Sequence, residues 1–126
     1  MMLVSNEAAL AFGRQWVEAF NSHDLEAIVS HYAQDVEFTS PVVIRLLGEP
    51  SGVVNGKPAL RAYFRKGLAA RPNLHFELIG VLAGVGSIAV HYRSVDGQAV
   101  VEAMTLDSGG FVRRAEVYCP LIGNSV

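Results

Sequence analysis

The sequence predicts a single α+β domain in which helices come first and an antiparallel sheet follows. A chain of 126 residues that is 51% apolar and 17% charged can build one compact core. Apolar residues before Pro72 follow helical spacing, whereas those after it alternate in short segments separated by glycines. This order is typical of the α+β class.

Three helices are expected. The first covers residues 6–21 and carries aromatic residues every four positions, namely Phe12, Trp16 and Phe20. The second follows Asp24, a good N-cap, and ends near Gln34; its apolar stripe consists of Leu25, Ile28, Val29 and Tyr32. The third opens at Gly56-Lys57-Pro58 and is closed by Pro72.

The strands are predicted from alternation and turn residues. A short strand over 36–40 stops at Pro41, and a long connection over 41–55 follows. Four more strands are expected at 73–83, 87–94, 98–107 and 111–119, joined by three hairpin turns. No repeat or linker interrupts this pattern, so one domain spans 1–126. Helices on one face of such a curved sheet leave a cavity suited to a small apolar molecule.

Composition and motifs exclude several classes of function. A net charge of −2 without a basic stripe argues against nucleic acid. The start of the chain lacks a basic leader, which favours the cytoplasm, and the uncharged run 78–90 is too short to span a membrane. With Cys119 as the only cysteine and no paired histidine spacing, we expect no metal site. Without a phosphate-binding glycine loop, we expect no cofactor.

Glu102 is the main candidate for chemistry. Alternation along 98–107 places it in one row with Val100, Met104 and Leu106. If this row faces the helices, the buried carboxyl keeps its proton and can act as an acid, a base or a donor to a developing oxyanion. The alternative is a glutamate at the open end of the sheet, paired with an arginine such as Arg14, Arg45 or Arg113.

Trp16 is the second candidate. Its place in an aromatic stripe is typical of core packing, but a buried indole N–H needs an acceptor, and a ligand carbonyl could supply one.

Three segments resemble the nuclear transport factor 2-like superfamily, and most of all its ketosteroid-isomerase and SnoaL-like (polyketide cyclase) branch. They are 16–36 (WVEAFNSHDLEAIVSHYAQDV), 56–64 (GKPALRAYF) and 101–107 (VEAMTLD), so the likeness covers nearly the whole chain. The resemblance implies a cystatin-like, cone-shaped α+β barrel, with a curved antiparallel sheet packed on three helices.

The resemblance also bears on the site. The protonated acid of the steroid isomerase falls on Glu102, its oxyanion tyrosine falls on Trp16, and its base falls on Ser40, which cannot take a proton from carbon. We therefore expect negligible turnover of a 5-ene-3-ketosteroid. Two functions remain: an isomerase or cyclase acting on a hydrophobic cyclic or polyketide-like carbonyl compound, and a ligand-binding or dimerisation module without catalysis.

The remaining expected pocket residues come from both layers: Phe20, Tyr32, Phe38, Ser40, Tyr63, Phe64, Val90, Val100, Met104, Val117 and Cys119. The opposite face of the sheet carries Ile79, Ala89, Val101, Ala103 and Tyr118. That face is too apolar for free exposure to solvent, which predicts a homodimer formed through the sheets.

Overall fold

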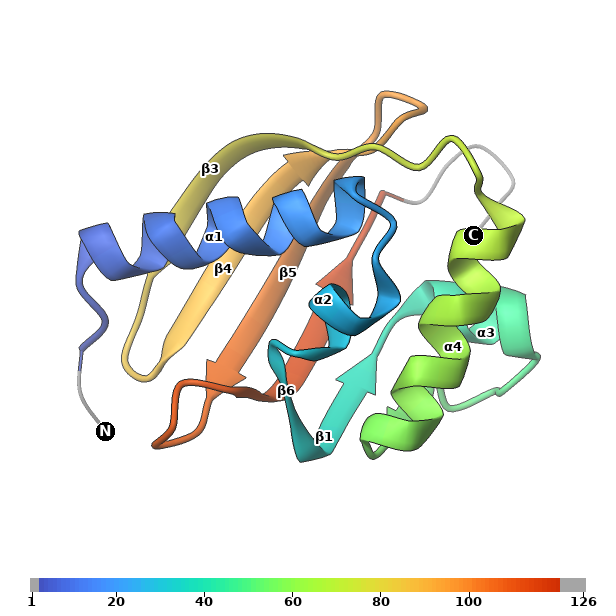
Figure 1. Cartoon of the computed structure of the whole chain (residues 1–126), viewed down its shortest axis with the longest axis horizontal. Coiled ribbons are helices and arrows are strands. Elements are labelled where there is room, and N and C mark those ends of the chain that lie inside the picture. The colour runs from blue at the N-terminus through green and yellow to red at the C-terminus, as the bar shows by residue number, and fades with distance from the viewer. Residues whose placement is uncertain (1–2, 121–126) are drawn as a thin grey trace.

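The computed structural model describes residues 3–120, and within them it contains four helices and one six-stranded sheet, which confirms the α+β prediction (Figure 1). The helices are α1 (Asn6–Asn21), α2 (Leu25–Val29), α3 (Pro41–Leu47) and α4 (Lys57–Ala70). The strands are β1 (Tyr32–Thr39), β2 (Val53–Asn55), β3 (Glu77–Ala83), β4 (Ser87–Arg93), β5 (Ala99–Leu106) and β6 (Val112–Tyr118). No helix in the described part of the chain is long and apolar enough to cross a membrane.

The strands are ordered β2-β1-β6-β5-β4-β3. The last four strands form the predicted antiparallel meander. One pair differs from the expectation of a wholly antiparallel sheet, because β1 runs parallel to β6 with Phe38 opposite Ala115. The sheet curves but does not close into a barrel, and β2 and β3 are its two edges. It is therefore an open cone.

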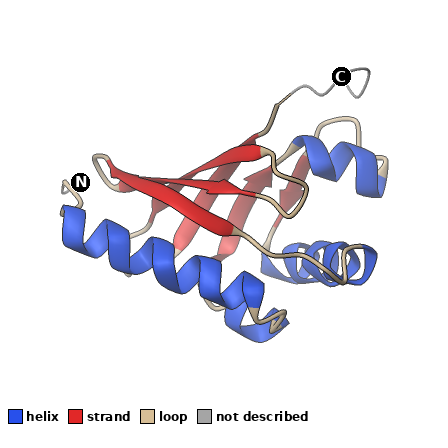
Figure 2. Cartoon of the chain, turned by 90° about the horizontal axis from the view of Figure 1, so that it is seen from above, coloured by secondary structure: helices blue, strands red, loops and turns tan. Residues whose placement is uncertain are grey.

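Helix α1 lies across one face of the sheet (Figures 1 and 2). Ser5 caps its start by accepting a hydrogen bond from the backbone N–H of Ala8 at 3.1 Å. At its other end, the Asn21 side chain donates to the carbonyl oxygen of Phe76 and accepts from its N–H, at 2.9 and 2.7 Å. These two bonds fix the segment that leads into β3.

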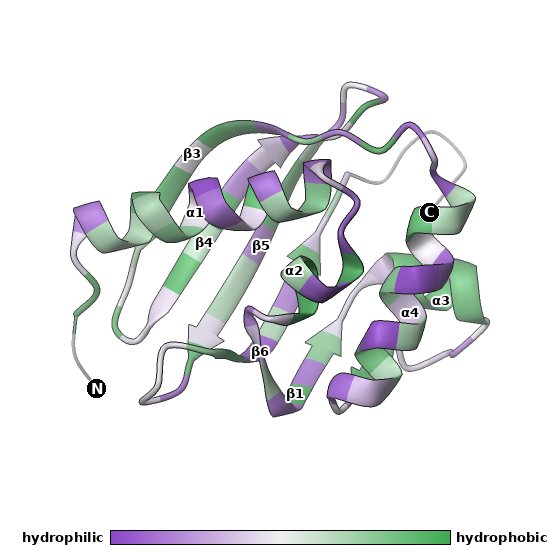
Figure 3. Ribbon diagram, viewed as in Figure 1, coloured by the Kyte–Doolittle hydropathy of each residue, from purple (hydrophilic) through white to green (hydrophobic). Residues whose placement is uncertain are grey.

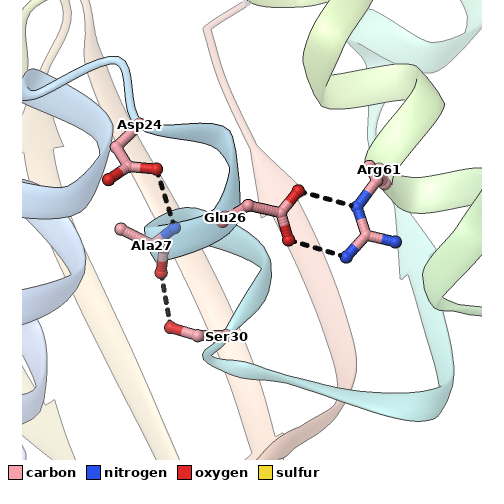
Figure 4. Close-up of polar contacts among 5 residues, drawn as sticks. All are labelled: Asp24, Glu26, Ala27, Ser30 and Arg61. Atoms are coloured by element: carbon pink, nitrogen blue, oxygen red, sulfur yellow. Dashed lines mark hydrogen bonds and ion pairs between the residues drawn. The ribbon is translucent and has the colours of Figure 1, made fainter.

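Helix α2 is shorter than predicted. Asp24 caps it as expected, accepting from the N–H of Ala27 at 3.2 Å, but the helix ends at Val29 and Tyr32 begins β1. Pairing with β6 determines this boundary, since Tyr32 lies opposite Val112. Figure 4 shows how α2 is tied to α4, with the Arg61 guanidinium donating to both carboxylate oxygens of Glu26 at 2.9 and 3.1 Å.

The expected connection over 41–55 contains a helix and a strand. Ser40 caps α3 by accepting from the N–H of Val42 at 3.1 Å, and Pro41 occupies the first turn. Gly48 ends the helix in the left-handed region with φ 69°, a conformation that glycine adopts without a steric penalty. The chain then returns as β2 beside β1, so this segment is a structured wall at one end of the sheet.

The core lies between the helices and the inner face of the sheet. Polar and apolar residues alternate along α1 and α4 (Figure 3), and the apolar stripes are buried, with Trp16 and Leu60 at 0% exposure. In β5 the buried residues are Val100, Glu102 and Met104, as the alternation predicted, whereas Leu106, the fourth residue of the predicted row, is half-buried beyond a register shift. The inner row of the sheet therefore carries one carboxyl.

Candidate functional site

A cavity of about 180 Å³ opens between the inner face of the sheet, α3 and α4. The loop joining β4 to β5 and the segment after α4 form part of its rim. The lining is mainly apolar and aromatic, with a small number of polar groups, as in most small-molecule sites. Its residues are Phe20, Phe38, Ser40, Val42, Arg45, Tyr63, Phe64, Gly67, Leu68, Arg71, Leu74, Phe76, Tyr92, Ser94, Val95, Asp96, Gln98, Val100, Glu102, Val117 and Cys119.

Glu102 lines this cavity with a side chain that is only partly satisfied. The residue is 5% exposed, and its Oε1 accepts a hydrogen bond from the Tyr92 hydroxyl at 3.0 Å. Its Oε2 is buried and has no hydrogen-bond partner within residues 3–120. Burial raises the pKa of Glu102 to about 8, against the smaller opposing effect of the Tyr92 hydrogen bond. The carboxyl therefore holds its proton at pH 7.

Three buried tyrosines surround this carboxyl. Burial raises the pKa of Tyr32, Tyr63 and Tyr92, and a negative charge on Glu102 would raise each of them further. None of the arginines considered as partners (Arg14, Arg45 and Arg113) forms an ion pair with Glu102 in the described chain. Because the carboxyl and the tyrosines are all neutral at this pH, the inner end of the cavity is polar but uncharged.

Trp16 differs from the expectation that it lines the polar end of the cavity. The ring is fully buried, and its Nε1–H donates to the Tyr32 hydroxyl at 3.1 Å. It also packs against the ring of Tyr92, with centroids 5.5 Å apart. The tyrosine takes the acceptor role considered for a ligand carbonyl, so Trp16 supports the tyrosines behind Glu102 and does not line the cavity.

The other expected pocket residues divide into two groups. Those that line the cavity are Phe20, Phe38, Ser40, Tyr63, Phe64, Val100, Val117 and Cys119. The remaining three, Tyr32, Val90 and Met104, lie in the closed core at 1% exposure or less. Their side chains belong to the packed core and do not line the cavity.

Ser40 is 2% exposed, and its hydroxyl accepts from the N–H of Val42. This bond makes the residue an N-cap and gives it a structural role at the edge of the cavity.

Sequence reasoning missed Tyr92, Phe76, Arg71 and Asp96, and it named Arg45 only as a possible partner of Glu102 and not as a residue at the mouth of the cavity. Tyr92 could have been found from the hairpin around Asp96-Gly97, whose register pairs Val90 with Glu102 and Tyr92 with Val100. That register places the tyrosine diagonal to Glu102 on the same face. No comparable signal places Arg45 at the mouth, because α3 was not expected and its side chains could not be placed.

Fold and site together define an α+β protein with a ligand-sized cavity and a protonated carboxyl at its inner end. The family comparison is specific: the model of the SnoaL-like domain matches residues 13–115, and the chain belongs to this family. No curated protein matches the chain.

Three similar solved structures have the same fold. A SnoaL-like protein of unknown function from Burkholderia thailandensis E264 is 40% identical at a TM-score of 0.90, over 94% of this chain and 99% of that one. A protein from Agrobacterium tumefaciens C58, provisionally assigned as an isomerase of the SnoaL-like family, is 15% identical at 0.72, over 90% and 97%. A protein of unknown function with a cystatin-like fold from Methylobium petroleophilum PM1 is 11% identical at 0.73, over 98% and 84%.

Proposed function

We propose that this protein is a small-molecule enzyme of the isomerase or cyclase type, which binds a cyclic carbonyl compound and stabilises its enol form through Glu102. The family supports this class of activity, since its members include proteins provisionally assigned as isomerases. The particular residue and the class of ligand are inferred from the cavity.

The observation that carries the proposal is the unpartnered Oε2 of Glu102. A buried polar atom without a hydrogen-bond partner is rare in folded proteins and costs on the order of 1–3 kcal/mol. A ligand carbonyl would remove this cost by accepting the proton on Oε2. The aromatic lining would at the same time exclude water from the ligand ring.

The chemistry follows from the protonation state. In enolisation, a C–H bond next to the carbonyl breaks and its proton passes to a water molecule at the open mouth of the cavity. The C–H electron pair becomes the C=C bond of the enol, and the π pair of the C=O bond moves onto the carbonyl oxygen. The Glu102 O–H donates a hydrogen bond to this oxygen and stabilises the negative charge that develops on it. Such a preformed donor in a dry site is worth a factor of roughly 10²–10³ in rate.

The role of Ser40 as a helix cap favours a second candidate function, that of a ligand-binding module without catalysis. Its hydroxyl is engaged as the cap of α3, and the other acidic residue of the lining, Asp96, has a side chain 42% exposed at the rim. The cavity thus holds one carboxyl at its inner end. A reaction that needs a second acid or base beside Glu102 would find none there in the part of the chain that the structure describes, and this favours a ligand-binding module.

Acetophenone is a suitable probe, because its single ring suits a cavity of this size and its methyl protons exchange through the enol. We expect the wild type to accelerate deuterium incorporation into the methyl group in D₂O, followed by NMR. Glu102→Leu removes the donor and should abolish about 99% of the acceleration. Glu102→Gln keeps an N–H donor and should lose less. The acceleration should be present below pH 8 and fade above it, as Glu102 loses its proton.

Glu18→Gln makes the same chemical change on the exposed side of α1 and should behave as the wild type. Cumene has a similar shape without the carbonyl and should bind more weakly than acetophenone. Unchanged exchange in Glu102→Leu would refute the catalytic role. Glu102-dependent binding without accelerated exchange would instead identify a binding module.

A further inference from the structure

The mouth of the cavity carries charges that the proposed function does not use. Arg45 of α3, Arg71 after α4 and Asp96 in the β4–β5 loop all line it. Arg71 and Asp96 form an ion pair at 3.8 Å, whereas Arg45 pairs with no acidic side chain within residues 3–120. Among the described residues, the Arg45 guanidinium therefore has no counter-charge.

Arg45 and Tyr63 line the same cavity. The pKa of Tyr63 is raised mainly by burial, and the positive charge of Arg45 is a smaller effect in the opposite direction. With Glu102 protonated, the charged groups of the lining sum to a single positive charge at the mouth. The whole chain has a net charge of −2, so this local excess is a property of the site.

The size of the cavity limits what it encloses. Its volume of about 180 Å³ is near that of an engineered cavity of roughly 150 Å³ that holds benzene, and it lies below the range of about 300–1,000 Å³ found for drug-sized ligands. One ring fits inside. Any further group must extend to the mouth, where Arg45, Arg71 and Asp96 lie.

We propose that the ligand is a one-ring monocarboxylate that lies with its ring in the cavity, a carbonyl oxygen at Glu102 and its carboxylate beside Arg45. The assignment rests on the proposed function and specifies its substrate class. An arginine recognises a carboxylate through two parallel N–H donors, and Arg45 is exposed, so a ligand group at the mouth can reach it. A single negative charge matches the single uncompensated positive charge of the mouth.

Three isosteric probes separate the two ends of the ligand. 4-Acetylbenzoate has both groups, 4-acetylbenzamide lacks the charge, and 4-isopropylbenzoate lacks the carbonyl. We expect 4-acetylbenzoate to bind about tenfold more tightly than the amide, because only the acid makes a charge-assisted contact with Arg45. In Arg45→Gln this preference should fall to near one, with binding of the amide unchanged. A second pair, 3-(4-acetylphenyl)propanoate and its amide, tests a longer distance between the carbonyl and the carboxylate of the ligand.

Arg14→Gln is the matched control, since Arg14 is exposed on α1 and does not line the cavity. It should retain the full preference for the carboxylate. Equal affinity for acid and amide in both pairs would overturn the inference, and so would a preference that survives in Arg45→Gln. In either case, Glu102-dependent exchange of acetophenone would leave the proposed function standing. If 4-isopropylbenzoate binds as tightly as 4-acetylbenzoate, the carbonyl contact at Glu102 fails and the inference is overturned at that end of the ligand.

Discussion

Glu102 holds a proton that the same residue loses in an unfolded chain at neutral pH. Its pKa in the folded protein is about 8, compared with an ordinary value of 4.5. Between these two pH values the folded state binds one more proton than the unfolded state. Stability therefore falls as pH rises through this window, and the full contribution is present only below about pH 4.5.

Glu102→Gln should remove this dependence, because the amide does not ionise. We expect the variant to match the wild type within about 1 kcal/mol at pH 4.5. At pH 8 and above it should be more stable by roughly a few kcal/mol, because each tenfold change in proton affinity between the folded and unfolded states corresponds to about 1.4 kcal/mol. Urea unfolding at several pH values between 4.5 and 9 measures the difference.

Other titrating groups contribute equally to both proteins and cancel in this comparison. Glu18→Gln should track the wild type at every pH. A wild type that gains stability relative to Glu102→Gln as pH rises would contradict the buried, protonated assignment.

At the scale of elements, local signals located most of the fold. Period-two alternation and the turns at residues 84–86, 96–97 and 108–110 were sufficient for the four-strand meander. The boundary of α2 was not predictable in this way, since Tyr32 satisfies both a helical stripe and a buried strand position. A contact with β6, far away in the chain, decides between them.

Helix α3 was missed for a different reason. Its sequence, PVVIRLL, is short and has no clear polar face, so periodicity carries no information. Its capping residues, Ser40, Pro41 and Gly48, were the available signal. Missing α3 also meant that Arg45 was not placed at the mouth of the cavity, whereas Glu102 was found because strand alternation alone shows which residues share its face.

The contact between α1 and β3 depends on Gly13. A Cβ at this position would lie 2.5 Å from Cγ2 of Val81, closer than two carbons can approach. Alanine favours a helix over glycine by about 1 kcal/mol, but overpacking costs roughly 1–3 kcal/mol. We expect Gly13→Ala to lower the free energy of unfolding by about 1 kcal/mol, measured by urea denaturation.

Val81→Ala removes the methyl group that clashes. In that background the same Gly13→Ala change should raise stability, because only the helix preference remains. A Gly13→Ala protein more stable than the wild type would show that the helix can move away from β3 at little cost.

At the scale of the whole molecule, the face of the sheet opposite α1 is apolar and partly exposed. Ile79 is 44% and Tyr118 is 54% exposed, and Val101 and Ala103 lie half-buried between them. We expect two copies to pair through this face in a self-complementary contact. Light scattering at micromolar concentration should give the mass of a dimer.

Ala103→Glu would place a charge in the centre of that face and should yield a monomer. Ala62→Glu, on the exposed surface of α4, should leave the mass unchanged. A monomeric wild type would refute the pairing, and the apolar face would then need another explanation.

The parallel pairing of β1 with β6 also governs when the cavity can form. The two strands come from opposite parts of the chain, and β6 is the last of the six strands to be made. Until it arrives, β1 and β5 each expose an unpaired edge, and the wall containing Val117 is absent. Such non-local pairing slows folding and leaves strand edges open to aggregation. A ribosome must therefore have released the chain through β6 before a ligand has anywhere to bind.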